Sequence, residues 1–276
     1  MPAVTPALAS IVFTAGVFAG ALGALLGLGG GIFLVPFLNI ALNLPFPVAA
    51  AISLTTVIAT SSSVSAARSG KQLINLRLGM LLEVATAAGS LLGGITAQLV
   101  SPLLLERLFG IIATGIAGMM ITRLNRRNVI LDPSIDVGVL GGRYYEEESN
   151  GTVAYRVKRL PLALTASFVA GNVSSLLGIG GGVIKVPVLN AWCGIPLRAA
   201  AATSVFMIGV TATAGAVIYY GHNQLPAALA AAAVLGVQLG TAGGMRFAAR
   251  APVKWLKVLM AVLLFVVAVM MFARPR

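Results

Sequence analysis

The sequence has little charge and almost no cysteine or histidine. Of its 276 residues, 9% are charged, whereas a soluble domain carries roughly 25%. The single cysteine, Cys193, excludes an internal disulfide and gives no cysteine-based metal or redox motif. The single histidine, His222, lies in a short polar segment away from any nucleophile or metal-ligand cluster. These scarcities argue against an enzyme and predict no cofactor and no metal.

Apolar sequence is what the chain has in abundance. Hydrophobic residues make up 58% of it, and the mean hydropathy is +0.98. One water-soluble core cannot bury so much apolar sequence, and a membrane span needs about 20 apolar residues. The sequence therefore predicts an all-α polytopic protein of the inner or plasma membrane. The apolar stretches lie at about 7–43, 48–67, 78–100, 104–122, 161–191, 199–220, 225–245 and 255–273.

The net charge of +12 would suggest nucleic acid as a partner if the protein were soluble. Most of the basic residues lie between the apolar stretches, where they orient a membrane chain, so we expect no nucleic acid. The largest polar segment, 123–160, separates two apolar halves. We therefore predict a first transmembrane repeat over 1–122, a polar cytoplasmic loop over 123–160 and a second transmembrane repeat over 161–276.

The two halves are copies at an offset of 151 residues. The segments 19–39 and 170–190 are identical at 12 of 21 positions. The same register continues without a gap and aligns, for example, Ser53 with Ser204. An ungapped register over most of each half predicts a duplicated fold.

The distribution of basic residues favours copies that run in opposite directions. If each of the long stretches 7–43 and 161–191 crosses the membrane once, the copies are parallel and the loop basic residues divide 12 to 6. If each stretch is instead a hairpin that enters and leaves by one face, the copies are inverted and the division is 15 to 3. The stronger bias favours inversion. Each half is then expected to contain a glycine-interrupted hairpin and about three transmembrane helices.

Both long stretches are interrupted by a glycine motif. A hairpin inside the bilayer exposes backbone groups, and these are tolerated only where they line a cavity or contact protein. Glycine interruptions at matching places in two inverted halves indicate the binding site of a transporter. The helix that follows each motif offers free N–H groups and a positive dipole end, which suit a small anion. The alternative is that the glycines serve close helix packing. The candidate residues are Gly29, Gly30, Gly31, Gly180, Gly181 and Gly182.

Lys185 is a charge inside an apolar stretch, where the first copy has Leu34. An ionisable residue at that depth is costly and is a functional-site hypothesis by default. We expect its partner to be the bound anion. The alternative is that its long side chain extends to the nearer membrane interface.

Other polar residues of the apolar stretches are candidates to complete the cavity. The hydroxyls of Ser53, Thr56 and Ser204 could donate to an oxyanion or form bonds between helices. Asn39 and Asn190 end the two short helices and are either ligands or C-caps. Glu83 is a lone acid that could carry a proton for coupling or lie near the lipid headgroups without a role.

The paired segments GLGGG…P…LN and GIGGG…P…LN, each followed by an alanine-rich run ending in Ser53 or Ser204, resemble the TauE/SafE sulfite-exporter family. The resemblance covers roughly 15–122 and 166–273 and leaves out the central loop. It implies movement of sulfite, sulfonates or related organic anions across the inner membrane. Direction and substrate stay open, because members are linked to both export and uptake.

A secondary transporter of a small anion, working by alternating access, is the function that these features favour. A passive anion channel is the nearest alternative, and a membrane scaffold or sensor acting through 123–160 is a third. The expected partners are the anion and the lipid bilayer, with protons as the candidate coupling ion. A homo-oligomer is left open.

Overall fold

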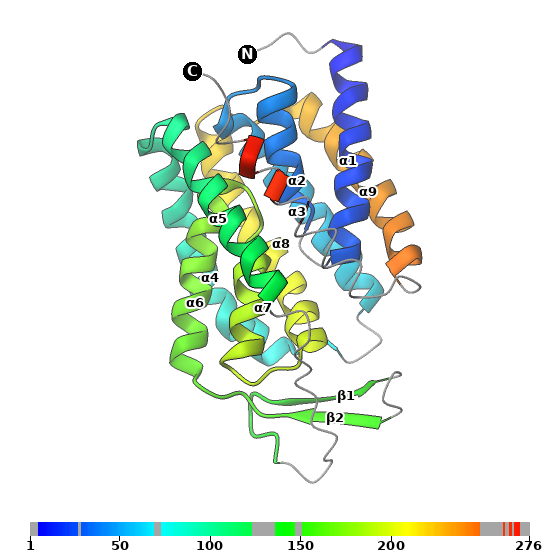
Figure 1. Cartoon of the computed structure of the whole chain (residues 1–276), viewed down its shortest axis with the longest axis vertical. Helices are drawn as coiled ribbons and strands as arrows, with labels where there is room; N and C mark the ends of the chain where they lie inside the picture. The colour runs from blue at the N-terminus through cyan, green and yellow to red at the C-terminus, as the bar shows by residue number, and fades with distance from the viewer. Residues whose placement is uncertain are drawn as a thin grey trace.

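The computed structural model describes residues 5–26, 29–68, 73–122, 136–146 and 151–248, together with 262, 265–266 and 268–270. Long helices stand side by side in a bundle, and one end of the bundle carries a small β-hairpin (Figure 1). The helices are α1 (Pro6–Leu26), α2 (Gly31–Pro36), the π-helical turn η1 (Phe37–Ala41), α3 (Phe46–Arg68), α4 (Leu76–Leu99), α5 (Pro102–Thr122), α6 (Leu160–Leu177), α7 (Gly182–Ala191), α8 (Leu197–Gly221) and α9 (Ala227–Ala248).

Six of the described helices are long and apolar enough to cross a membrane: α1, α3, α4, α6, α8 and α9. Their lengths of 18 to 25 residues match the roughly 20 residues that a bilayer requires. The prediction of an all-α polytopic membrane protein is confirmed.

Each glycine-interrupted stretch folds as a long helix, a sharp turn and a short helix. The turn residues Gly30 and Gly181 have φ values of 74° and 66°, in the left-handed region that glycine adopts without steric cost. In Figure 1 the arms of α1 and α2 open toward the end that holds the N-terminus, and those of α6 and α7 open toward the β-hairpin. The chain therefore returns to the end from which it entered in both stretches.

Helices α3 and α8 hold the same place in their repeats and pack against each other antiparallel. Ser61, late in α3, donates to the carbonyl of Val205, early in α8, over 2.5 Å. Conversely, Gly215 late in α8 lies against Leu54 early in α3. Equivalent helices thus run in opposite directions through the bundle.

The contacts between the two halves are reciprocal. Helix α1 packs on α9, and its repeat equivalent α6 packs on α4, the equivalent of α9. Gly20 of α1 meets the carbonyl of Val237, and Gly171 of α6 meets that of Thr86. Each residue of the second contact lies 151 positions from its counterpart in the first. The described halves therefore exchange under a pseudo-two-fold rotation.

The β-hairpin lies within the segment expected to be a polar loop, and it was not predicted. Strands β1 (Gly142–Glu146) and β2 (Gly151–Tyr155) pair antiparallel, with Tyr144 opposite Val153. Tyr144 and Val153 are buried in one apolar cluster with Leu78 at the start of α4. Part of 123–160 is therefore folded and packed against the end of the bundle.

Asn75 ties the hairpin to the bundle. It caps α4 by accepting from the Leu78 amide over 3.0 Å, and its side-chain nitrogen donates to the carbonyl of Leu140 over 2.8 Å and to the Tyr155 hydroxyl over 3.2 Å. Burial raises the pKa of the Tyr155 phenol, although the hydrogen bond from Asn75 acts in the opposite direction. The neutral phenol is therefore the form that the packed hairpin favours.

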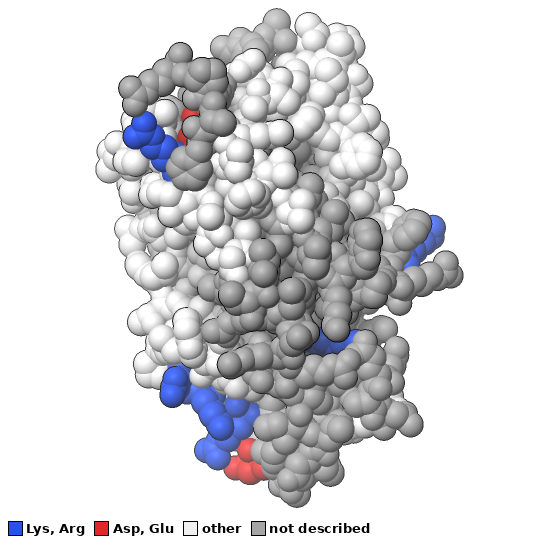
Figure 2. Space-filling view, in the orientation of Figure 1, with Lys and Arg blue, Asp and Glu red and all other residues white. Residues whose placement is uncertain are grey.

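Most of the described basic residues lie at the hairpin end. Figure 2 shows a cluster of Lys and Arg side chains near the hairpin, next to a broad region without charge. Arg107, near the start of α5, lies at the opposite end. An uncharged band between charged ends is the pattern of a membrane-spanning bundle. The residues at the hairpin end are Arg77, Arg143, Arg156, Lys158, Arg159 and Arg198.

Candidate functional site

Lys185 is enclosed by helices and is 1% exposed. It lies in the first turn of α7, three residues after Gly182. Its ammonium group donates to the hydroxyl of Thr211 on α8 over 3.5 Å, a long hydrogen bond. The side chain thus points into the bundle rather than toward one of its ends. The hydrogen-bond partner of the ammonium among the described residues is therefore a neutral hydroxyl.

Glu83 lies on the other side of the same hydroxyl. The Thr211 hydroxyl is 2.8 Å from Glu83 Oε1 and 3.0 Å from the Met207 carbonyl, and its single proton can serve one of them at a time. Glu83 is 8% exposed. Its second oxygen, Oε2, is buried and has no hydrogen-bond partner among the described residues. We refer to Lys185, Thr211 and Glu83 as the buried triad.

The buried triad breaks the pseudo-symmetry of the fold. The residues at the repeat offset of 151 from Lys185, Thr211 and Glu83 are Leu34, Thr60 and Val234. Thr60 donates to the carbonyl of its own helix at Thr56 over 2.9 Å. The same scaffold therefore carries opposite charges on one side of its axis and apolar residues on the other.

A network of buried hydroxyls adjoins the buried triad, and it was not predicted. Ser90 of α4 donates to the carbonyl of Thr211 over 2.6 Å and lies 2.7 Å from the hydroxyl of Ser175 on α6. Tyr219 of α8 donates to the Ser175 carbonyl over 2.9 Å. Glu83, Thr86 and Ser90 have the spacing i, i+3, i+7, which places them on one face of α4. That spacing was the available signal in the sequence.

The two glycine turns meet near the pseudo-symmetry axis. Gly29 and Gly180 both lie against the side chains of Val57 and Ile208, which are themselves repeat equivalents. A Cβ on Gly31 would lie 2.6 Å from the Gly178 carbonyl. The structure thus brings the two motifs together and accounts for the glycines by backbone conformation and close packing.

The predicted hydroxyls differ in how they are used. Ser53 donates to the Gly178 carbonyl over 2.6 Å, linking α3 to the second glycine turn. Thr56 donates to the carbonyl of Ser53 in its own helix over 2.7 Å. Ser204 is buried beside Gly182, and its hydroxyl has no partner among the described residues. Of the three, Ser204 retains an unused donor.

Asn39 and Asn190 brace the chain after the short helices. Asn39 donates to the carbonyl of Leu44 over 3.0 Å and to Glu106 over 3.1 Å. Asn190 donates to the carbonyl of Ile195, the repeat equivalent of Leu44, over 2.8 Å. The C-caps of these helices are Leu42 and Trp192, so both asparagines stabilise the following turn from inside the helix, and their role as ligands stays a prediction.

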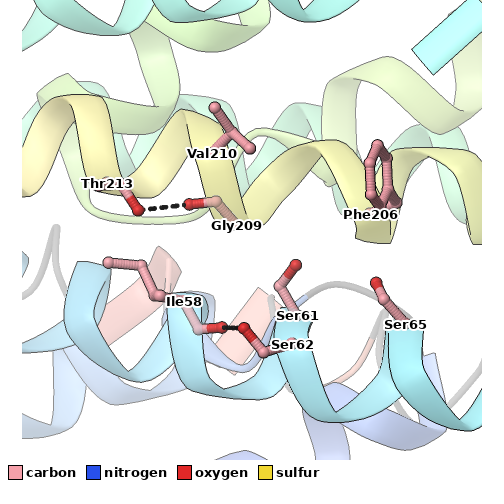
Figure 3. Close-up of a pocket in the computed structure, with 8 residues that line it drawn as sticks. All are labelled: Ile58, Ser61, Ser62, Ser65, Phe206, Gly209, Val210 and Thr213. Atoms are coloured by element: carbon pink, nitrogen blue, oxygen red, sulfur yellow. Dashed lines mark hydrogen bonds between the residues drawn. The ribbon is translucent and has the colours of Figure 1, made fainter. Parts of the chain in front are cut away.

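A groove of about 410 Å³ lies between α3 and α8 (Figure 3). The hydroxyls of Ser62 and Thr213, which are repeat equivalents, donate to carbonyls of their own helices, as the dashed lines show. None of the eight lining residues is charged, so the groove offers no counter-charge to an anion. Its lining residues are Ile58, Ser61, Ser62, Ser65, Phe206, Gly209, Val210 and Thr213.

The family described as sulfite exporter TauE/SafE matches residues 12–271. The chain belongs to the TauE/SafE family. The resemblance in the glycine segments is thereby confirmed, and the match runs through both halves and the segment between them. The protein is therefore a multi-pass cell membrane protein of a transporter family.

Two curated relatives carry transporter names. The chain is 29% identical over 243 residues to the probable membrane transporter protein YunE of Bacillus subtilis, a match that covers 84% of this chain and 87% of YunE. It is 26% identical over 224 residues to a probable membrane transporter protein of Methanocaldococcus jannaschii, covering 77% of this chain and 73% of the relative. No solved structure matches the chain. Within the part of the TauE/SafE chain that the structure describes, no group of three metal-ligating residues occurs.

Proposed function

We propose that the protein is a secondary transporter that moves a small anion of the sulfite or sulfonate class across the cell membrane by alternating access. The observation that carries the proposal is Lys185, a cation 1% exposed inside a membrane-spanning bundle. Burying an ammonium group costs several kcal/mol unless strong partners compensate it. An anionic substrate provides such compensation while it is bound.

The donors around Lys185 suit an oxyanion. An ammonium has three N–H donors, and the Thr211 contact uses one of them, at 3.5 Å. Lys185 lies in the first turn of α7, at the positive end of the helix dipole. Ser204 adds an unused hydroxyl beside the same turn. The sulfur-containing class itself comes from the family, whose description names sulfite.

The arrangement of the halves supports alternating access. Transporters built from inverted repeats expose one central site alternately to the two sides as one half moves against the other. Here equivalent helices α3 and α8 run antiparallel, and the two glycine hairpins open toward opposite ends of the bundle. We infer that the axis between the halves lies in the membrane plane.

The proposal is tested by flux into liposomes that contain the purified protein. Sulfite, thiosulfate, sulfonates and short carboxylates are offered in turn, and initial rates are measured against concentration. We expect saturable flux for at least one anion of the sulfur class. Lys185→Leu, which installs the residue present at Leu34 of the other half, should lower that flux about tenfold or more. The control Lys158→Leu alters an exposed lysine at the hairpin end and should retain it.

Three results would contradict the proposal or the role that it gives to Lys185. Flux that rises linearly with concentration and follows the membrane voltage would indicate the channel alternative. Absence of flux for every anion of the panel, in protein that remains folded and inserted, would favour the scaffold or sensor. Equal flux in Lys185→Leu and in the unmodified protein would remove Lys185 from the site.

A further inference from the structure

We propose that Glu83 and the substrate anion alternate as the partner of Lys185, and that Glu83 takes up a proton when the anion binds. The inference rests on the proposed transport function and extends it to the coupling ion and to the charge of the substrate. It predicts that anion and proton cross the membrane together.

Burial makes a net charge on the triad costly. With Glu83 ionised and Lys185 protonated, the buried triad carries no net charge. A bound monoanion would leave one net negative charge in a water-excluded site, at a cost of several kcal/mol. One proton on Glu83 restores neutrality, because the carboxylate becomes a carboxylic acid while the anion pairs with the ammonium. The site is then neutral both when empty and when loaded.

The position of the Thr211 hydroxyl allows Lys185 to change partners. Thr211 stands between the two charges, 3.5 Å from the Lys185 nitrogen and 2.8 Å from Glu83 Oε1. The Met207 carbonyl lies 3.0 Å from the same hydroxyl. It can accept the hydrogen bond from Thr211 once Glu83 is protonated. A direct, tightly paired salt bridge would resist replacement by substrate, whereas a bridged pair leaves the ammonium open to a competing anion.

Glu83 also has an oxygen available to hold the proton. Its Oε2 is buried without a hydrogen-bond partner among the described residues, and such an orphaned carboxylate oxygen is costly unless it is protonated or bound. An orphaned oxygen beside an exchangeable cation therefore points to a group that changes protonation state during the cycle.

Few other titratable groups face Glu83 from the helices packed on it. Among the described residues, α6 carries no titratable side chain. On α8, Arg198 lies more than three turns before Thr211, and Tyr219 and Tyr220 lie two turns or more beyond it. On α4 itself, Arg77 lies at the hairpin end of the helix. Lys185 of α7 is thus the charged group that interacts with Glu83.

The net charge of the loaded triad also predicts a preference for monoanions over dianions. A monoanion plus one proton leaves the buried triad neutral, whereas a dianion would need a second proton acceptor. The hydroxyls that adjoin the triad, Ser90 and Ser175, do not accept a proton at physiological pH. We therefore expect bisulfite and sulfonates to be preferred to sulfate.

Simultaneous measurement of anion and proton movement tests the inference. Liposomes with a trapped pH-sensitive dye receive an inward gradient of a monovalent sulfonate, which, unlike bisulfite, has no proton of its own to release near neutral pH. The unmodified protein should move about one proton with each anion. In Glu83→Gln, whose amide resembles the neutral carboxylic acid, proton movement should fall about tenfold or more relative to anion exchange. An unchanged ratio of protons to anions in Glu83→Gln would overturn the inference.

Matched variants separate misfolding and failed transport from failed coupling. The double variant Lys185→Leu with Glu83→Val gives the buried triad the apolar residues found at the repeat-equivalent positions, Leu34 and Val234. Replacing both members of a buried pair by apolar residues is often neutral or stabilising, so this variant should remain folded in detergent but move neither anion nor proton. If the unmodified protein moves anions without protons, the coupling inference fails and the transport function stands. If it moves no anion at all, the transport proposal fails first.

Discussion

Thr211 and Thr60 show how one residue type serves two purposes at equivalent positions of the two halves. Both are buried, and both can bond the carbonyl one helical turn earlier. Thr211 additionally lies between an ammonium and a carboxylate. The difference comes from the neighbouring residues, which are charged around Thr211 and apolar at the equivalent positions around Thr60.

Replacing each threonine by valine should therefore have unequal effects. Thr211→Val keeps the shape but removes a hydrogen bond to a charged group, a loss of about 1.5–3 kcal/mol. We expect the initial rate of anion uptake at low concentration to fall about tenfold or more. Thr60→Val is the matched control, since its hydroxyl bonds only its own helix, and uptake should change by less than about twofold. Equal effects of the two variants would show that the bridging role of Thr211 is unimportant.

A second residue-scale prediction concerns the glycine turns. Gly180 has a φ of 80°, and a Cβ there would lie 2.9 Å from Val57. We expect Gly180→Ala to destabilise the folded protein by about 2–4 kcal/mol, combining left-handed strain and overpacking. Gly115→Ala is the control, because no described atom outside the nearby backbone of α5 lies within 4 Å of its Cβ position, and it should be neutral or slightly stabilising. Thermal unfolding in detergent measures both, and similar melting temperatures for the two variants would contradict this account of the turn.

Lys185 and Glu83 could each be selected from the sequence, because a charge in an apolar stretch is rare for energetic reasons. Their proximity could not, because Glu83 and Lys185 lie 102 positions apart on different helices. The pairing depends on α4 packing against α8 and α7 packing against α8. No local pattern encodes those two contacts, so the expected partner of Lys185 was the substrate alone.

At the scale of elements, the β-hairpin was missed for an identifiable reason. Its strands have five residues each and include exposed charged or polar side chains, so their apolar alternation is short. The pair Asn150-Gly151, whose glycine is the first residue of β2, is common in hairpin turns and was the available signal. The short helices α2 and α7 could be predicted because the glycine motif that precedes them occurs twice in register. The sequence of the β-hairpin occurs only in the segment between the repeats, so no second copy supported its prediction.

The hairpin should behave as a packed part of the bundle. Val153 is fully buried and its neighbour Thr152 is exposed. Val153→Asp places a charge in the apolar cluster and should undock the hairpin. We expect hydrogen exchange of the β1 and β2 amides to accelerate about tenfold or more, while Thr152→Asp leaves it nearly unchanged. Slow exchange in both variants would show that the contact with the bundle does not protect the hairpin.

At the scale of the molecule, the duplication and the charge bias could be extracted from the sequence because both are properties of the linear chain. The pseudo-two-fold contacts are not, because the packing of α1 on α9 and of α6 on α4 joins the first helix of each half to a helix of the other. Only the fold shows that the first helix of each half packs against a helix of the other half.

Inverted halves make a direct prediction about accessibility. Tyr145 of the hairpin and Asn223, between α8 and α9, are both exposed and lie at opposite ends of the bundle. If the halves are inverted in the membrane, Tyr145→Cys should react with a membrane-impermeant thiol reagent only from the cytoplasm, and Asn223→Cys only from outside. Parallel halves would place both on the same side. Reaction of both from one side would refute the inversion.

The native cysteine should not interfere with this labelling. Cys193 is fully buried, and burial raises the pKa of its thiol despite the opposing effect of Arg159. The thiolate is the reactive form, so a buried thiol that stays protonated at neutral pH reacts slowly. The unmodified protein is thus its own background control, and it should incorporate little reagent from either side.

The most direct test of the account is counterflow of a labelled anion. Liposomes containing the protein are loaded with unlabelled sulfite or sulfonate and diluted into a trace of the labelled anion. A transporter that alternates access around Lys185 should accumulate label transiently above its equilibrium level, and Lys185→Leu should abolish this overshoot. Label that only equilibrates in the unmodified protein, or an overshoot that survives Lys185→Leu, would contradict the account.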